Sequence, residues 1–218
     1  MKKIICLLLA NAVLVTAFAQ SEKYIKAMEA NVQVIESTRK VEELQDLANT
    51  FERIAEAEKN QWQPYYYAAL AQVYAGLSTS NGQMGGLVDK IDPIADKAES
   101  LLNKAEAISK NNAEIYIVKK MIATLRMMAD PQNRYMQYGQ QAQQALETAR
   151  RLDPNNPRVY LLEGQDKFYT PEQYGGSKTE AKRLFELTLT KFETFKPAST
   201  IDPNWGKGTA QHFLNQMK

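Results

Sequence analysis

Residues 98–116, AESLLNKAEAISKNNAEIY, and residues 142–160, AQQALETARRLDPNNPRVY, follow one pattern. Each stretch begins with an alanine, has a leucine four positions on, and has a second alanine three positions further. A tyrosine closes both stretches, 18 positions after the first alanine and behind a polar turn. Positions i, i+4 and i+7 share one stripe of an α-helix. Each stretch therefore predicts a helix with a close-packing face, a turn, and the start of the next helix.

Two weaker copies of the stripe extend the pattern to both sides. They are Leu47, Phe51 and Ile54, with Tyr65 at the same 18-residue distance, and Ala181, Phe185 and Thr188. Small residues on such a stripe let two helices approach closely, while the large residue fills the space between them. A single triplet of this kind arises by chance in amphipathic helices, whereas the repeated 18-residue distance indicates a repeat.

The sequence at this point resembles the tetratricopeptide repeat (TPR) family. The matching features are the stripe, the aromatic residue near the next helix start, Gly164 four positions after Tyr160, and the closing Leu152-Asp153-Pro154. They cover most of residues 42–192. The resemblance implies an all-α fold, a TPR-like helical-hairpin solenoid of about four helix pairs plus a C-terminal capping helix.

The spacing of the stripes departs from the family's period of 34 residues. The interval from Ala98 to Ala142 is 44 residues, and from Ala142 to Ala181 it is 39. We therefore expect degenerate repeats with longer internal loops and helices, and a generic helical bundle is the alternative.

The helix boundaries follow from local capping signals. Asp92-Pro93, Asp130-Pro131, Asn156-Pro157 and Asp202-Pro203 each place an N-cap side chain before a proline at the first helical position. Residues 177–180, SKTE, form a capping box. The expected helix pairs are 22–37 with 41–58, 64–77 with 93–109, 113–128 with 131–152, and 157–168 with 178–195, followed by a last helix at 203–216.

The N-terminus has the layout of a secretory signal peptide. Lys2 and Lys3 precede an apolar run from Ile4 to Val15, and 17–19, AFA, form a cleavage site. We expect residues 1–19 to be removed, leaving one domain, 20–218, exported across the inner membrane of a bacterium. The predicted location is the periplasm, with secretion as the alternative. No integral membrane segment is expected after cleavage.

Charge and cysteine content exclude several classes of function. The chain has 27 Lys plus Arg against 25 Asp plus Glu, and the excess of two belongs to Lys2 and Lys3. A neutral mature chain offers no global attraction for nucleic acid or anionic membranes. The only cysteine, Cys6, lies in the signal peptide, so the mature chain forms no disulfide and no thiolate site. We expect no cofactor and no metal.

Signals for catalysis are sparse. His212 is the only histidine, and an isolated histidine is more often a packed or surface residue than a catalyst. No zinc-protease, nucleophile-elbow or P-loop string occurs. We predict that the protein is not an enzyme. A hydrolase with a carboxylate pair assembled by folding is the remaining enzymatic alternative.

Two loops and one helix start are unusual in composition. The segments 77–92 and 168–177 each carry Gly-Gly, which favours a turn with positive φ over an anion cradle. Tyr169 and Tyr174 flank Pro171 and could form an aromatic patch. Three consecutive tyrosines, 65–67, point about 100° apart on a helix. We therefore expect at least one of them to face a groove or solvent.

The resemblance implies a protein scaffold that binds a partner protein or peptide on the concave face formed by the first helices. The residues that it places there are Tyr65, Gln72, Glu114, Met121, Arg158, Leu161, Gln165 and Tyr169. The alternative is a ligand-binding accessory protein of an envelope transport system, with a pocket formed by the long loops within the repeats. A closed cavity would favour the alternative, and an open trough would favour the scaffold.

Overall fold

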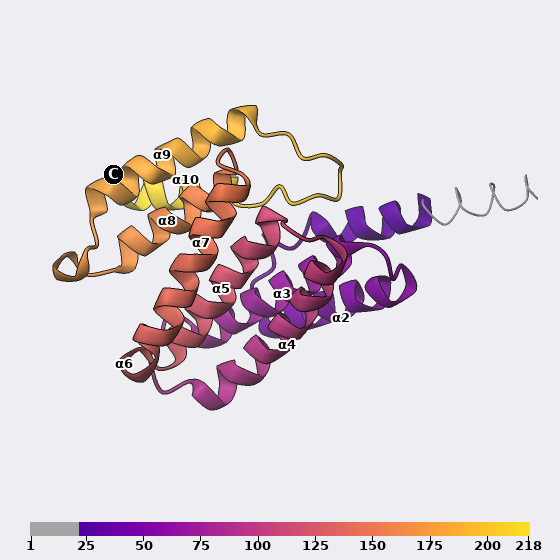
Figure 1. The fold of residues 1–218 in the computed structure, drawn as a ribbon, viewed down its shortest axis with the longest axis horizontal. Coiled ribbons are helices and arrows are strands. Elements are labelled where there is room, and N and C mark those ends of the chain that lie inside the picture. Colours follow the sequence, from indigo (N-terminus) through magenta and orange to yellow (C-terminus); the bar gives the residue numbers. More distant parts are fainter. Residues whose placement is uncertain (1–21) are drawn as a thin grey trace, which may run out of the picture.

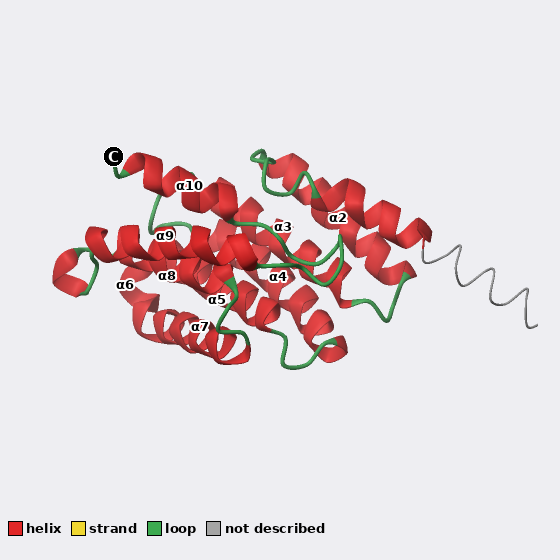
Figure 2. Cartoon of the chain, turned by 90° about the horizontal axis from the view of Figure 1, so that it is seen from above, coloured by secondary structure: helices red, strands yellow, loops and turns green. Residues whose placement is uncertain are grey.

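The computed structural model describes residues 22–218, and all regular structure in that range is helical (Figures 1 and 2). The all-α prediction is thereby confirmed. The predicted signal peptide and its cleavage site lie outside the described residues. After a first helical segment at 22–32, the order is α2 (Val41–Ala57), α3 (Trp62–Ser80), α4 (Val88–Ile108), α5 (Ala113–Ala129), α6 (Pro131–Arg134), a π-helical turn (Tyr135–Gly139), α7 (Gln140–Leu152), α8 (Pro157–Tyr169), a 3₁₀ turn (Glu172–Tyr174), α9 (Lys178–Thr194) and α10 (Lys207–Gln216).

Helices that follow one another in the chain pack side by side. Close contacts join α2 to α3, α3 to α4, α4 to α5, α5 to α7, and α8 to α9, and α3 also packs on α5. Figure 2 shows α10 on one side of the α8–α9 pair and α7 on the other. The packing in chain order agrees with helical hairpins, while a solenoid of TPR type stays a prediction.

The repeated stripes are contact faces between helices. Ala98, Leu102 and Ala105 are buried, and so are the two corresponding triplets on α7 and α9. Gly164 shows why small residues stand at such crossings, because a Cβ there would lie 2.7 Å from the ring of Phe185. Phe185 in turn stacks on Phe213 of α10, with ring centroids 4.7 Å apart. Helices α8, α9 and α10 therefore share one apolar core.

The substitution Ala142→Leu is expected to lower the free energy of unfolding by about 1–3 kcal/mol, because the added atoms overpack a buried helix contact. Gln143→Leu, one step round the same helix and exposed, should change it by no more than about 0.5 kcal/mol. Urea midpoints of the two variants measure the difference. Equal midpoints would show that α7 does not pack through the predicted stripe.

The start of α4 differs from the predicted boundary. The helix begins at Val88, so Pro93 lies inside it and Asp92 is not its N-cap. Asp92 instead accepts two hydrogen bonds from Arg134, at 2.6 and 2.7 Å. The hydrogen bond from Arg134 lowers the pKa of Asp92. An N-cap pattern in sequence does not reveal such a long-range partner.

Three other capping predictions are confirmed. Asp130, Asn156 and Ser177 each accept a hydrogen bond from a backbone N–H in the first turn of the following helix. The prediction that Asp202 is an N-cap is wrong, because α10 starts only at Lys207. Residues 203–206 are not helical, and Gly206 has a φ of 109°. The indole of Trp205 is therefore not on the helix but is buried in the core.

The aromatic residues at the start of α3 are all internal. Tyr65, Tyr66 and Tyr67 are buried, so the expectation that one of them faces a groove or solvent is wrong. Helix α3 is surrounded by α2, α4 and α5, which leaves no exposed side at its first turn. The three rings contribute to packing between helices.

The Gly-Gly segments form turns, as expected. Gly85, Gly86 and Gly175 have positive φ, and a Cβ at Gly176 would lie 1.7 Å from the carbonyl oxygen of Thr170. The N–H of Gly85 donates to the carbonyl oxygen of Met128 at 2.8 Å and is therefore not free to bind an anion. Glycine is needed here for the course of the backbone.

Candidate functional site

A polar cluster lies in the interior where α3, α5 and α8 meet. The guanidinium of Arg158 forms an ion pair with the carboxylate of Glu114, and its Nε lies 2.9 Å from Glu114 Oε2. Asn156 Nδ2 donates to the same carboxylate at 2.5 Å, and the Tyr66 hydroxyl donates to it at 3.3 Å. Burial works against the charged guanidinium, but the charge and hydrogen bonds of Glu114 outweigh it and raise the pKa of Arg158.

This cluster overturns part of the predicted concave face. Tyr65, Gln72, Glu114, Met121, Arg158 and Leu161 are all buried, so in this structure they do not line an open groove. Gln165 is partly exposed, and Tyr169 is 70% exposed at the end of α8. Any contribution of these last two residues to partner binding stays a prediction. The six residues lie on three helices, two each on α3, α5 and α8, and neighbouring parts of the protein cover them.

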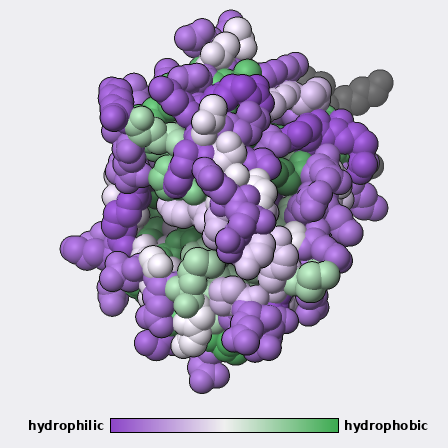
Figure 3. Space-filling view, turned by 90° about the vertical axis from the view of Figure 1, so that its left-hand side faces the viewer, coloured by the Kyte–Doolittle hydropathy of each residue, from purple (hydrophilic) through white to green (hydrophobic). Residues whose placement is uncertain are grey.

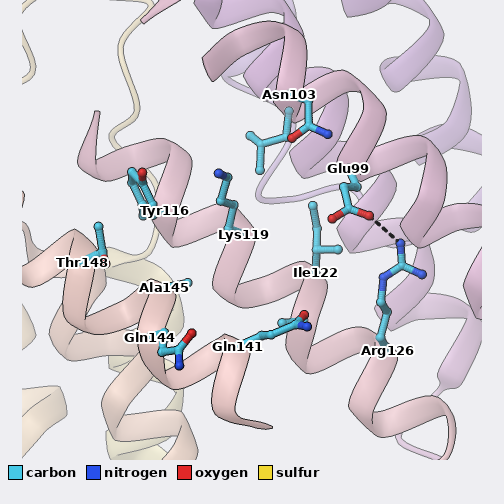
Figure 4. A pocket seen from close by; sticks show the side chains of 12 residues that line it. Glu99, Asn103, Tyr116, Lys119, Ile122, Arg126, Gln141, Gln144, Ala145 and Thr148 are labelled. Carbon is cyan, nitrogen blue, oxygen red and sulfur yellow. Dashed lines mark hydrogen bonds and ion pairs between the residues drawn. The ribbon is translucent and has the colours of Figure 1, made fainter. Parts of the chain in front are cut away.

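One hollow in the described residues is a groove of about 340 Å³ bounded by three helices (Figure 4). Helix α5 lies in the middle, and α4 and α7 form its two sides. Its lining comprises Glu99, Leu102, Asn103, Tyr116, Lys119, Ile122, Ala123, Arg126, Gln141, Gln144, Ala145 and Thr148. Each helix contributes positions three, four or seven apart, which is one continuous stripe. This hollow lies between helices, and the pocket predicted from the long loops stays a prediction.

The groove combines an apolar floor with two cationic side chains. Lys119 Nζ lies 2.7 Å from both carboxylate oxygens of Glu106 and 4.8 Å from the centre of the Tyr116 ring. Arg126 Nη2 donates to Asp96 at 2.7 Å and to Glu99 at 2.9 Å. Figure 4 shows Lys119 and Arg126 on the same helix, with Ile122 between them.

The two cations keep hydrogen-bonding capacity. Lysine has three N–H donors and arginine five, and both ion pairs of Arg126 use the single atom Nη2. Burial disfavours the charge of Arg126, but the hydrogen bond to Asp96 and the charge of Glu99 raise its pKa. It therefore remains a cation at any ordinary pH. An anionic group at the rim of the groove could accept hydrogen bonds from N–H groups of Lys119 and Arg126 that the carboxylates of α4 leave free.

The groove is lined by carboxylate, cationic, amide, hydroxyl and apolar side chains. No histidine or cysteine lines it, and the described residues contain no cluster of three or more His, Cys, Asp or Glu that could hold a metal ion. His212 is exposed on α10, where its Nε2 lies 3.0 Å from Gln216 Nε2. Lys119 and Arg126 are paired with three carboxylates of α4, and the arrangement suits noncovalent binding of a partly apolar molecule that accepts hydrogen bonds.

The face of the molecule shown in Figure 3 carries only small apolar patches. Figure 3 views the end of the molecule where α6 and the α8–α9 connection lie, and hydrophobic areas are small and separated by hydrophilic ones. Tyr169 and Tyr174 in that connection are each 70% exposed. Tyr169 also packs edge-on against Phe168 and Phe213. It is thus partly fixed by the core while its outer face stays free.

Comparison with known proteins gives one informative match. No protein-family model and no curated protein sequence matches the chain. Among solved structures, the HusA haemophore from Porphyromonas gingivalis matches with a TM-score of 0.77 and 30% identity, over 89% of this chain and 92% of that one. The chain belongs to the same family as HusA. HusA is, by its description, a binding protein for haem, and the TPR relationship of this chain stays a prediction.

Proposed function

We propose that the mature protein is an exported, non-enzymatic binding protein whose cargo is a porphyrin of the haem type. The observation that carries this proposal is the 30% identity with the HusA haemophore over nearly the whole of both chains. Of the two binding functions that the sequence left open, the relationship favours the ligand-binding protein over the partner scaffold. None of the described helices is long and apolar enough to span a membrane.

The groove between α4, α5 and α7 is the proposed place of binding. A porphyrin is flat and apolar, with carboxylate-bearing propionates on one edge. Leu102, Ile122 and Ala145 offer apolar contact to a ring, and Lys119 and Arg126 offer charge-assisted hydrogen bonds to the carboxylates. The groove's volume of about 340 Å³ is at the low end for ligand pockets, so only part of a porphyrin macrocycle would enter it.

The lining favours recognition of the ring and its carboxylates over recognition of iron. Histidine, cysteine, methionine and tyrosine are the side chains that hold haem iron in proteins, and of these only Tyr116 lines the groove. Its ring also lies against Lys119. A bound ferric porphyrin would therefore have at most the Tyr116 phenol as an iron ligand in this groove.

Titration with haemin tests the proposal. We expect a saturable change in the Soret absorbance of haemin with the mature protein. Ala145→Phe should weaken binding by at least about tenfold, equivalent to about 1.4 kcal/mol, because the added ring fills the groove from its half-buried wall. Gln143→Phe places the same ring on the exposed side of α7 and should leave affinity unchanged.

Two outcomes would count against this function. Absence of saturable haemin binding contradicts the cargo. Binding that both phenylalanine variants retain equally contradicts the groove but leaves the cargo standing. Circular dichroism of the two variants checks that each one is folded.

A further inference from the structure

A second pocket, of about 220 Å³, lies where the C-terminal part of the chain crosses the first helical segment. We call residues 199–206, the last part of the connection between α9 and α10, the strap. The strap is tied down by a hydrogen bond from Gly206 N–H to Glu36 Oε1, at 2.8 Å, and by one from Gln63 Nε2 to Asp202 Oδ1, at 3.2 Å. The pocket lies under it, against Tyr67 of α3. It shares no lining residue with the groove of α4, α5 and α7.

The hydroxyl of Tyr67 is the unusual feature of this pocket. Tyr67 is 0% exposed, and its Oη has no hydrogen-bond partner in the described part of the chain. Its ring is fixed by stacking on Phe51 at 5.2 Å. Burial, followed by the charge of Glu114, raises the pKa of Tyr67 well above its usual range, so the group is a neutral hydroxyl. Buried polar groups in native structures almost always have a partner, which makes this phenol a candidate ligand contact.

The charged residues that line this pocket are all acidic. Glu36 and Asp202 line the pocket, whereas no lysine or arginine does. Within residues 22–218 neither carboxylate takes part in an ion pair, although ten pairs form elsewhere. Each carboxylate accepts hydrogen bonds from neutral groups and has lone pairs to spare. Two negative charges beside a buried phenol favour a cation.

The remaining lining suits the body of a small organic cation. Val32 and Ile35 provide apolar surface, and the indole of Trp205 provides an aromatic face that attracts positive charge. A volume of about 220 Å³ admits only a few heavy atoms. Trp205 is itself held in place, since its Nε1 donates to the Tyr66 hydroxyl at 2.7 Å.

We propose that this pocket binds a primary ammonium group on a short alkyl chain. The three N–H donors of the ammonium group match the Tyr67 hydroxyl oxygen and the two carboxylates, and the alkyl chain lies against Val32, Ile35 and Trp205. The strap closes over the ligand, so binding joins the first helical segment to the C-terminal helices. This site is independent of the proposed porphyrin groove.

Binding of n-butylammonium, with n-butanol as a neutral probe of the same length, tests the site. Calorimetry or NMR titration of the mature protein should show saturable n-butylammonium binding at least about tenfold tighter than n-butanol binding. Asp202→Asn, which removes one charge, should weaken n-butylammonium binding by about tenfold or more. Glu186→Gln, an exposed carboxylate on α9, should have no effect.

Tyr67→Phe separates a ligand contact from a structural role. The substitution keeps the ring that stacks on Phe51 and removes only a hydroxyl without a partner, so the urea midpoint should not fall. Affinity for n-butylammonium should nevertheless fall severalfold. Equal affinity for n-butylammonium and n-butanol, absence of saturable binding, or unchanged binding in Tyr67→Phe would each overturn the proposal. Absence of saturable binding would indicate a pocket that holds only water, and unchanged binding in Tyr67→Phe would show that the phenol does not contact the ligand.

Discussion

Arg158→Met is expected to lower the free energy of unfolding by about 3–5 kcal/mol, because it leaves the carboxylate of Glu114 as an unpaired charge in the interior. Arg158 is 0% exposed, and besides Glu114 it donates to the carbonyl oxygen of Trp205 at 3.3 Å. The loss therefore affects α5, α8 and the strap together. Urea unfolding followed by circular dichroism measures it.

The double variant Arg158→Met with Glu114→Leu should recover a large part of that loss. A buried ion pair replaced by apolar residues of similar volume is often close to neutral in stability. Arg183→Met breaks a chemically similar Arg–Glu pair on the surface of α9 and should leave the urea midpoint essentially unchanged, since exposed pairs contribute little. A double variant as unstable as the sum of its two single variants would contradict the account.

The buried pair also shows where prediction from sequence reaches its limit. Glu114 and Arg158 stand at equivalent positions, near the starts of α5 and α8, and the repeat pattern correctly predicts that equivalence. Helical periodicity gives the face on which a residue lies, but not whether another helix covers that face. Six of the residues predicted for the concave face are buried, and Glu114 and Arg158 pair with each other in the interior.

The helices themselves were largely predictable because their signals are local. The N-caps at Asp130, Asn156 and Ser177, and the stripe around Ala142, depend on residues within one or two helical turns. The helix starts predicted at Pro93 and Pro203 are wrong. Proline is favoured at the first position of a helix, but a proline alone does not show that a helix begins there. In α4 the helix already begins at Val88, and at Pro203 the strap continues without regular structure.

The groove could not be predicted from the sequence for a different reason. Its lining combines two kinds of residue. The sequence pattern predicts a solvent-exposed position for Lys119 and Arg126, and a core position for Ile122. Both kinds of position occur on α5, because this helix has one side in the core and another between α4 and α7. The one useful signal was a helix with two cations seven positions apart, beside a neighbouring helix whose alanine at this face leaves room for a ligand.

Trp205→Ala is expected to lower the free energy of unfolding by about 3–5 kcal/mol, the usual cost of deleting a large aromatic side chain from a core. Trp205 is 5% exposed and packs edge-on near Tyr74, with ring centroids 6.3 Å apart. Its indole N–H is the donor to Tyr66, which in turn donates to Glu114. Deleting the indole therefore opens a cavity and also removes a member of the buried polar cluster.

Two further variants separate the contributions of volume and hydrogen bonding at this position. Trp205→Phe keeps an aromatic ring but loses the donor to Tyr66. It should therefore lower the free energy of unfolding, but by less than Trp205→Ala does. Tyr174→Ala removes a ring that is 70% exposed and should change the free energy of unfolding by no more than about 0.5 kcal/mol. Circular dichroism is the appropriate signal, because Trp205 is one of only two tryptophans in the chain. A Trp205→Ala variant as stable as Tyr174→Ala would show that the strap is not anchored in the core, and the pocket beneath it would then have no fixed wall.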